Sequence, residues 1–292
     1  MNLSPFGKQQ TNVFSSELTI ELGRVVTGLS KENALQGKNT VVAICGGSCT
    51  GKSTQVTSAL KEELGDQAVV FHQDAFQNNP SYQASFDETY RWDHPDNFDL
   101  RACEDALMGL VTNEVVVIPD YSFQTDEPIG TKTIAPRPII LFEGLYASFK
   151  QLLHFSDLVI YVEAPFYARL IRRIYRNTRE RYKGRDPGAI VQGFVSSVTQ
   201  AHQDFVQQQK AEAYLTPHMP FHFGELIERF RLVPLAGRAM YDWSVSLDHD
   251  LTIGLNGSNH SFLLLYREEK YLEFTMDQLS FERLKELDWW RC

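Results

Sequence analysis

One stretch of the sequence combines glycines with a lysine and hydroxyl side chains at the spacing GxxxxGK[ST]. The stretch comprises Gly46, Gly47, Ser48, Cys49, Thr50, Gly51, Lys52 and Ser53. In such a loop, backbone N–H groups surround phosphate oxygens, the lysine reaches the β- and γ-phosphates, and the last hydroxyl ligates Mg²⁺. We therefore predict that residues 46–54, Thr54 included, bind ATP with Mg²⁺, although the pattern does not distinguish ATP from GTP.

Two carboxylates stand at or just past the ends of apolar runs. Asp74 follows the run 68–71 and Glu143 follows the run 139–142. Open α/β sheets bind their ligands beyond the carboxyl ends of the strands. Phosphoryl transfer to an alcohol needs Mg²⁺ and a positioned base, so both acids are candidates for these tasks. The alternative for each is a helix-capping or solvated acid.

A run of arginines marks a helical segment expected from Pro165 to about Tyr182. It contains Arg169, Arg172, Arg173, Arg176, Arg179 and Arg181, with Lys183 and Arg185 just beyond. A charge run usually marks a solvated helix face. In a chain of net charge −9, however, this run is a local exception. Because arginine suits bidentate contacts with phosphate, we predict a lid that closes over the nucleotide.

Short apolar runs alternate with helical patterns around these residues. Strands are expected at 40–44, 68–71, 115–118, 139–142 and 158–162, and helices at 14–35, 52–64, 100–111 and 165–182. This alternation is typical of βαβ units. It predicts an α/β fold in which a P-loop NTPase-type parallel sheet is flanked by helices.

The pattern changes after about Leu215, where short alternating segments replace the βα units. They cover 241–247 and 251–255, and a hairpin over 261–275 would turn at 267–270. Helices are expected at 224–230 and 276–287. We predict a small β-rich C-terminal appendage over 215–292, a P-loop domain over 38–214 and a helical segment over 1–37.

Composition excludes several classes of protein. The 292 residues are 43% hydrophobic and 22% charged, which is typical of a globular protein. With 28 Lys and Arg against 37 Asp and Glu, the chain is a poor binder of nucleic acid. The first ten residues lack the apolar core of a signal peptide, and no run approaches a membrane span. Four cysteines without CxxC spacing fit a reduced compartment, so we expect a cytoplasmic protein.

Six sequence segments together resemble the uridine kinase and phosphoribulokinase family of P-loop small-molecule kinases. They are GGSCTGKST (46–54), HQDAF (72–76), WDHPDNFD (92–99), IPDYSF (118–123), ILFEGLYASF (140–149) and RLIRRIYRNTRER (169–181). They occur in the family's order over about residues 38–210, within the P-loop kinase domain predicted above. The resemblance implies an ATP-dependent kinase that phosphorylates a hydroxyl of a small molecule.

The resemblance also implies roles for single residues. Asp74 matches the catalytic base, and Ser53 and Glu143 match the magnesium ligands. Asp93 matches a residue that holds ribose hydroxyls, and Tyr121 matches an aromatic residue beside the acceptor base. The lid residues that contact substrate or phosphate are matched by Arg173, Arg176, Arg181 and, across an apparent insertion, Arg185.

Two positions depart from the uridine kinase pattern. Asp126 stands where a pyrimidine-reading histidine is expected, and Gln77 stands where a tyrosine is expected. An ionised aspartate only accepts hydrogen bonds, so Asp126 in the acceptor pocket would favour cytidine or the cationic nicotinamide riboside over uridine. The alternative is that Asp126 points to solvent in a rearranged loop.

Several functions remain open. Uridine and cytidine lead the acceptors, followed by nicotinamide riboside, other ribosyl compounds, pantothenate and sugars. A regulatory nucleotide-binding module without acceptor chemistry is the alternative of another class, and Asp74 and Asp93 argue against it. The oligomeric state is open, a homo-oligomer included.

Overall fold

The computed structural model describes most of the chain up to residue 219 and several segments after it. The described residues are 13–78, 91–181, 187–219, 233–234, 243–246, 251–256, 258, 260–266, 270–275, 278 and 282. The chain forms two compact units, which are treated separately below. The first unit comprises Met1–Ala164 and Ala201–Pro220, and the second comprises Pro165–Gln200 and Phe221–Cys292.

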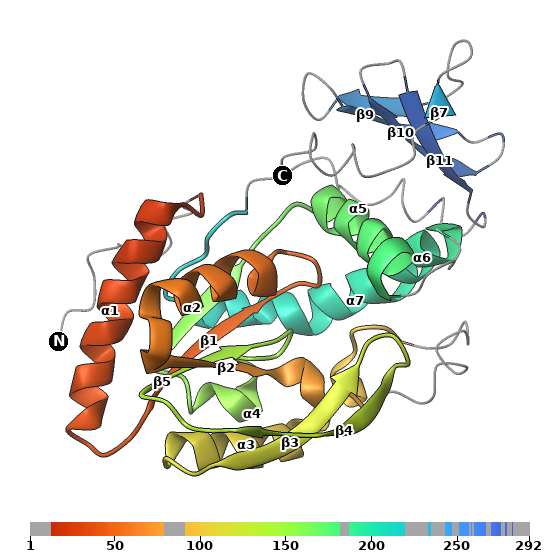
Figure 1. Ribbon diagram of the computed structural model, residues 1–292. Helices are drawn as coiled ribbons and strands as arrows, with labels where there is room; N and C mark the ends of the chain where they lie inside the picture. The colour runs from red at the N-terminus through yellow and green to blue at the C-terminus, as the bar shows by residue number, and fades with distance from the viewer. Residues whose placement is uncertain are drawn as a thin grey trace. The chain divides into compact units, whose positions relative to one another are not determined.

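A four-stranded parallel sheet forms the centre of the first unit (Figure 1). Its strands, in spatial order, are β2 (Ala68–His72), β5 (Ile139–Glu143), β1 (Thr40–Gly46) and β6 (Leu158–Val162). The register pairs Ile44 with Glu143 and His72 with Glu143. The carboxyl ends of β1, β2 and β5 therefore meet at one edge, as the α/β prediction required.

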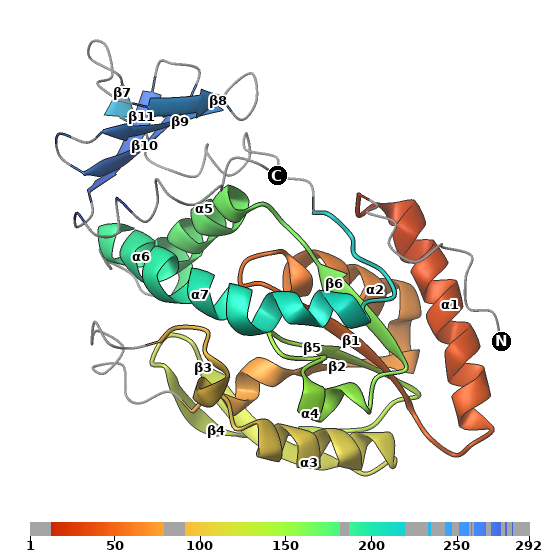
Figure 2. The same ribbon diagram turned by 180° about the vertical axis from the view of Figure 1, so that it is seen from behind.

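Alternating side chains of β1 enter two different hydrophobic layers. Val41, Ala43 and Cys45 pack with α3 and α4, whereas Val42 and Ile44 pack with α1 and α2. Both faces of a parallel sheet are covered in this way, which is why its strands read as continuous apolar runs. Figure 2 shows the same layers from behind.

The helical segments of the first unit follow the sequence expectation closely. The longer ones are α1 (Ser16–Ala34), α2 (Ser58–Leu64) and α3 (Leu100–Val111), with a π-helical turn, η1 (Lys52–Thr57), leading into α2. Side chains cap two of them: Ser15 accepts from the Leu18 N–H at 3.2 Å and Asp99 from the Ala102 N–H at 2.9 Å. The shorter segments are η2 (Gly65–Gln67), η3 (Gln73–Phe76), η5 (Pro95–Asn97), α4 (Lys150–Leu153), η8 (His202–Val206) and η9 (Gln207–Glu212).

One expected strand lies outside the parallel sheet. The run 115–118 becomes β3 (Val116–Ser122), which pairs antiparallel with β4 (Glu127–Ile134) in a separate two-stranded sheet. The prediction that this run belongs to the parallel sheet was wrong, and β4 was not predicted. Seven of the eight residues of β4 are exposed, so it lacks the apolar alternation that marks a half-buried strand.

The second unit contains helices and an antiparallel sheet. The helical segments are α5 (Phe166–Arg176), η6 (Asn177–Arg181), α6 (Pro187–Gly193) and η7 (Phe194–Val198), followed by α7 (Thr199–Ala201). The five strands, in spatial order, are β7 (Val233–Pro234), β11 (Lys270–Thr275), β10 (Ser261–Tyr266), β9 (Leu251–Asn256) and β8 (Trp243–Ser246). The β-rich appendage and its hairpin are thus confirmed, with Tyr266 paired to Lys270 at the turn. The expected helix at 224–230 lies outside the described residues, and so does nearly all of the one at 276–287.

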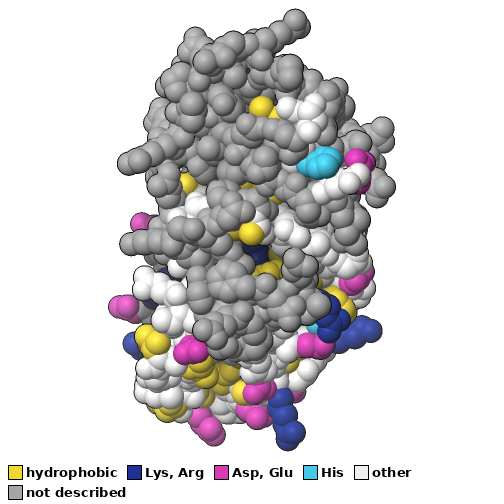
Figure 3. Space-filling model, turned by 90° about the vertical axis from the view of Figure 1, so that its right-hand side faces the viewer, with side chains coloured by type: hydrophobic (Ala, Val, Ile, Leu, Met, Phe, Trp, Pro, Cys, Tyr) yellow, Lys and Arg dark blue, Asp and Glu magenta, His cyan; other side chains and the backbone are white. Residues whose placement is uncertain are grey.

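Among the described residues on the face seen in Figure 3, Lys and Arg side chains are interspersed with Asp and Glu side chains. Within the described residues, no helix is both long and apolar enough to cross a membrane.

Candidate active site

The phosphate loop follows β1, and its backbone adopts a conformation that requires glycine at two positions. At Gly46 the backbone has φ +137°, and an added Cβ would lie 2.3 Å from the main-chain oxygen of Val162. Gly51 has φ +101° directly before η1 begins. Positive φ and close backbone approach both favour glycine. Cys49 also has a positive φ, +64°, in the middle of the loop.

Lys52 lies inside this loop. Its side chain is buried, and Nζ donates to the main-chain oxygen of Gly47 at 3.0 Å. The hydroxyl of Thr50 donates to the same oxygen at 3.0 Å. The loop therefore encloses a buried ammonium group at the start of a helical segment, an arrangement suited to binding phosphate anions.

Glu143, the last residue of β5, is a buried acid at the strand-end edge of the sheet. Its Oε2 lies 2.9 Å from Nδ1 of His72, the last residue of β2, and the Ser53 hydroxyl also hydrogen-bonds the carboxylate. Burial alone would raise the pKa of Glu143, but the His72 bond, the Lys52 charge and the Ser53 bond together hold it below its ordinary value. Glu143 is therefore ionised at neutral pH.

These donors fit a magnesium ion. Mg²⁺ is usually held by one or two carboxylates together with phosphate oxygens and water, not by a cage of protein ligands. The Glu143 carboxylate and the Ser53 hydroxyl are hard oxygen donors beside Lys52. In the described part of the chain, no group of three or more His, Cys, Asp or Glu side chains could hold a metal ion. The remaining ligands of a magnesium ion would therefore be phosphate oxygens and water.

Asp74 lies in η3, two residues after the end of β2. It is half-buried. The pKa of His72 is raised chiefly by its hydrogen bond with Glu143, and the charge of Asp74 makes a smaller contribution in the same direction. Asp74 therefore lies at the strand-end edge of the sheet, near His72, which bonds Glu143. Its role as the base stays a prediction.

The segment that contains Asp93 is bonded to the segment that contains Asp74. Gln77 and Phe98 form an antiparallel bridge, and the Asp99 N–H donates to the Phe76 oxygen at 2.8 Å. Asp93 itself is half-buried and has φ +59°.

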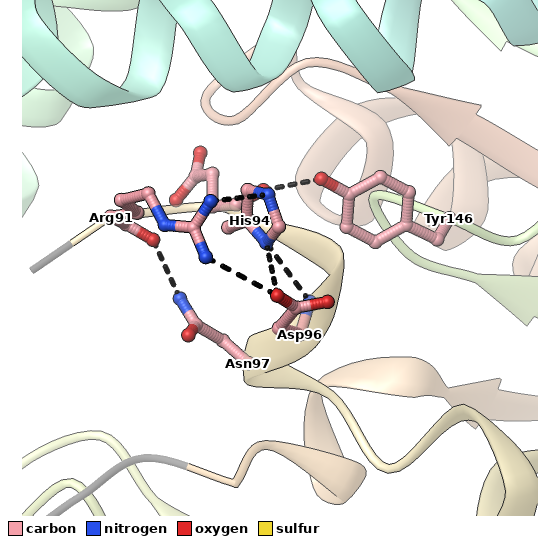
Figure 4. Close-up of polar contacts among 6 residues, drawn as sticks. Arg91, His94, Asp96, Asn97 and Tyr146 are labelled. Carbon is pink, nitrogen blue, oxygen red and sulfur yellow. Dashed lines mark hydrogen bonds and ion pairs between the residues drawn. The ribbon is translucent and has the colours of Figure 1, made fainter.

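Polar contacts within 91–97 fix the turn that follows Asp93 (Figure 4). Arg91 lies 3.3 Å from the Asp96 carboxylate and 3.2 Å from Nε2 of His94, and the Asn97 amide donates to the Arg91 oxygen at 2.8 Å. Burial and the charge of Arg91 lower the pKa of His94, against the opposing effect of Asp96. His94 is therefore mostly neutral at pH 7.

The β3–β4 hairpin contains the other two predicted acceptor residues. β3 packs against η3, the segment of Asp74, and the Tyr121 ring lies edge-on to Phe123 with 5.3 Å between ring centroids. Asp126 has φ +55° and is buried, with 1% of its surface exposed. The alternative that Asp126 points to solvent is therefore wrong.

The predicted lid arginines belong to the second unit. Arg173 is buried, with its guanidinium 5.9 Å from the centre of the Phe194 ring, and Arg169 lies 5.6 Å from the same ring. Arg176 is half-buried and donates to the Asn177 side chain at 3.3 Å. Arg181 ends η6, and Arg185 lies outside the described residues. Their contacts with nucleotide remain a prediction.

The structure adds residues that the sequence did not indicate. Gln209, in η9, is buried and clamps the segment after β5: its Oε1 accepts from the Ser148 N–H at 3.0 Å, and its Nε2 donates to the Leu145 oxygen at 2.7 Å. Tyr146, in this segment, donates its N–H to Oε1 of Gln73 in η3 at 2.8 Å, and His72 pairs with Glu143. His72, Gln73 and Tyr146 lie in segments that carry the family resemblance, and His72 also stands at a strand end near Asp74.

A parallel sheet with a phosphate loop after β1 and acids at the ends of β2 and β5 defines a P-loop nucleotide-binding protein. Residues 41–220 match the phosphoribulokinase / uridine kinase family. The chain belongs to this family of kinases.

Individual relatives are similar over the same region. A uridine kinase of Bacillus pumilus is 30% identical over 183 residues, which is 61% of this chain and 86% of that protein. A uridine kinase of Deinococcus deserti is 31% identical over 185 residues, covering 61% and 87%. Among solved structures, phosphoribulokinase from Rhodobacter spheroides superposes with a TM-score of 0.49 at 13% identity, covering 79% of this chain and 81% of that one.

Proposed function

We propose that this protein transfers the γ-phosphoryl group of ATP, in the presence of Mg²⁺, to a hydroxyl of a nucleoside or related ribosyl compound. The observation that carries the proposal is the connection between two segments of the first unit. The segment of Asp74 and the segment of Asp93 are joined by backbone hydrogen bonds, and the charge of Asp74 acts on His72, which bonds Glu143. A nucleotide switch needs a phosphate loop and a metal ligand, but it does not need a base and an acceptor-binding acid next to them.

The residues divide the chemistry between them. Lys52 and the loop amides bind the phosphates. Ser53 and Glu143 would hold Mg²⁺, which would supply positive charge to the phosphate groups when bound. Asp93 binds hydroxyls of the acceptor. Asp74 accepts the proton of the attacking hydroxyl. Arg173, Arg176 and Arg181 supply positive charge to the transferring phosphoryl group from the lid.

Asp126 sets the expected order among acceptors. The relatives are named uridine kinases, so uridine and cytidine head the panel. A carboxylate facing the O4 carbonyl of uracil is repulsive, and a site with mismatched polar groups rejects a substrate strongly. We therefore expect cytidine, with its amino group, or the cationic nicotinamide riboside to exceed uridine in kcat/KM.

A coupled assay of ADP release tests the proposal. ATP and Mg²⁺ are supplied with uridine, cytidine, nicotinamide riboside, pantothenate or a sugar, for the wild type and for Lys52→Ala and Asp126→His. We expect release that depends on the acceptor, its near-complete loss in a folded Lys52→Ala variant, and a shift toward uridine in Asp126→His.

The outcomes separate the classes. ADP release without dependence on any acceptor would identify a nucleotide-binding module or ATPase. A Lys52→Ala variant with near wild-type turnover would refute the kinase. Uridine as the best acceptor, with an unchanged order in Asp126→His, would refute the role of Asp126 alone.

A further inference from the structure

Tyr146 connects the strand end of Glu143 with both segments that face the acceptor. It is the third residue after Glu143, and its side chain is fully buried. Its hydroxyl donates to the main-chain oxygen of Asp93, and the dashed line that starts at the Tyr146 hydroxyl in Figure 4 marks this bond. Its N–H donates to Oε1 of Gln73, the residue before Asp74, at 2.8 Å.

Asp93 needs an external support for its backbone. A φ of +59° is uncommon for a residue other than glycine and persists only where the surroundings hold it. The contacts among Arg91, His94, Asp96 and Asn97 are internal to the turn, and several of their side chains are exposed. Contacts that join the turn to the rest of the first unit include the edge-on packing of His94 against Phe205 at 4.9 Å, the Asn78 N–H, which donates to the Asn97 oxygen at 2.8 Å, and the Tyr146 hydroxyl. Of these three, the Tyr146 bond is the one made to Asp93 itself.

The Tyr146 hydroxyl is a dependable donor. Burial, reinforced by the nearby charges of Asp93 and Asp96, raises the pKa of Tyr146 well above its ordinary value. The phenol is therefore protonated at every pH at which the protein would work. A main-chain carbonyl can only accept, so the direction of this hydrogen bond is fixed.

We propose that Tyr146 is a positioning residue for the acceptor: its hydroxyl holds the main chain of Asp93 so that the Asp93 carboxylate meets the acceptor hydroxyls. This inference rests on the proposed function, in which Asp93 binds the acceptor. The competing role for Tyr146 is packing alone, because its ring also lies edge-on to Phe98 at 5.5 Å and to Phe149 at 5.3 Å.

The variant Tyr146→Phe separates these roles, because it removes the hydroxyl and keeps the ring. A hydrogen bond of ordinary strength corresponds to a factor of about 3 to 10 in an equilibrium constant. We expect the KM for the acceptor to rise by about that factor, with the KM for ATP and the melting temperature close to wild type. Tyr161→Phe is the matched control, since Tyr161 is a buried tyrosine of the same hydrophobic layer, and it should leave both KM values unchanged.

A double-mutant cycle with Asp93→Asn tests whether Tyr146 acts through Asp93. If it does, adding Tyr146→Phe to Asp93→Asn should raise the acceptor KM little further, because the two changes are not independent. Fully additive effects would assign Tyr146 to packing and overturn the proposal. An acceptor KM of Tyr146→Phe equal to that of the wild type would overturn it as well.

Hydrogen exchange without any ligand keeps this inference distinct from the proposed function. Amides of residues 91–99 should exchange faster in Tyr146→Phe than in the wild type, while those of β1 stay protected. Unchanged exchange there would overturn the anchoring role even in an active kinase. A wild type that phosphorylates no acceptor would refute the proposed function and the acceptor role of Tyr146, and faster exchange would then leave only the backbone anchor.

Discussion

Asp74 lies just past the end of β2 and Glu143 is the last residue of β5, and the two carboxylates have different surroundings. Glu143 is buried and bonded to His72 and Ser53, whereas Asp74 is half-buried in a short helical turn. We expect Asp74→Asn to lose turnover by about 10²- to 10⁴-fold with ATP binding largely intact, since it removes a base. Glu143→Gln should instead raise the Mg²⁺ concentration that half-maximal activity requires.

Steady-state kinetics with a titration of Mg²⁺, combined with direct measurement of ATP binding, distinguish these two effects. Glu104→Gln is a suitable control, because Glu104 lies on α3 and bonds the exposed Gln151 side chain. If Asp74→Asn and Glu143→Gln produced the same mild change in nucleotide affinity and nothing else, the division of roles would be refuted.

His72 and Glu143 form a pair whose contribution to stability depends on pH. The bond to Glu143 raises the pKa of His72 above 6.5, so this contribution is complete below about pH 6.5 and is lost as the pH rises through the folded-state value. The pKa of Glu143 is lowered from 4.5, so its contribution is lost only as the pH falls through that lower value. The stabilisation by the pair is therefore largest between about pH 5 and 6.5.

Thermal unfolding of His72→Gln at several pH values measures this effect. The difference in melting temperature from the wild type should be largest near pH 6 and smaller at pH 9. It should be modest, because 47% of the His72 side chain is exposed. His154→Gln, at an exposed histidine, controls for the loss of an imidazole elsewhere on the surface. A His72→Gln difference that is constant over pH would contradict the assignment.

The residues of the phosphate loop were predictable because their spacing reflects a backbone geometry that few residues permit. Lys52, Glu143 and Asp74 also have local signals, namely a motif and two strand ends. Tyr146 lies in the segment 140–149 that carries the resemblance, but nothing in the sequence indicates that it bonds Asp93, and Gln209 has no local signal for its bonds to the segment 145–148. Each has its partner far along the chain. Hydrophobic periodicity cannot reveal such pairs.

Buried strands and helices were predictable from the sequence, because burial requires apolar residues at regular positions. β1, β5 and β6 are buried along their whole length, so their apolar runs identify them. β4 is exposed and contains Pro128 and Gly130, so its pairing with β3 could not be read from the pattern. The acceptor residues Tyr121 and Asp126 lie on or beside this hairpin, which makes the acceptor pocket the least predictable part of the site.

The arginine-rich helix α5 permits a test of the lid. Arg173 packs on Phe194, so its removal would also disturb packing, whereas Arg176 is half-buried and is the better residue to change. We expect Arg176→Ala to lower kcat more than it weakens ATP binding, because the contact forms fully only in the transition state. Arg24→Ala, at an exposed position on α1, controls for the loss of a charge.

Hydrogen exchange over residues 169–190 provides the second measurement. Protection there should increase when an ATP analogue and the acceptor are bound together. Exchange that ignores both ligands, or an Arg176→Ala variant whose loss lies entirely in ATP affinity, would count against a lid.

The boundary between the two compact units differs from the boundary of the family match. The family match ends at residue 220, yet residues 165–200, which lie within the match, share a compact unit with residues 221–292, which lie beyond it. Inside this unit α6 packs against β11. The appendage is therefore in a position to stabilise helices next to the arginine-rich segment.

Truncation of the appendage, and a point variant in the full-length chain, test whether the appendage stabilises these helices. A chain truncated after residue 219 should lose protection from hydrogen exchange in α6, because the contact with β11 is gone, while β1 and β5 of the first unit keep theirs. Leu263→Ala is the milder variant, because it changes one side chain that is buried in β10. Replacing a buried leucine by alanine typically costs about 2–5 kcal/mol of stability. It should therefore lower the protection of both the sheet and α6. Unchanged protection of α6 in both variants would show that the appendage does not support these helices, and loss of protection in β1 as well would show that the two units do not unfold separately.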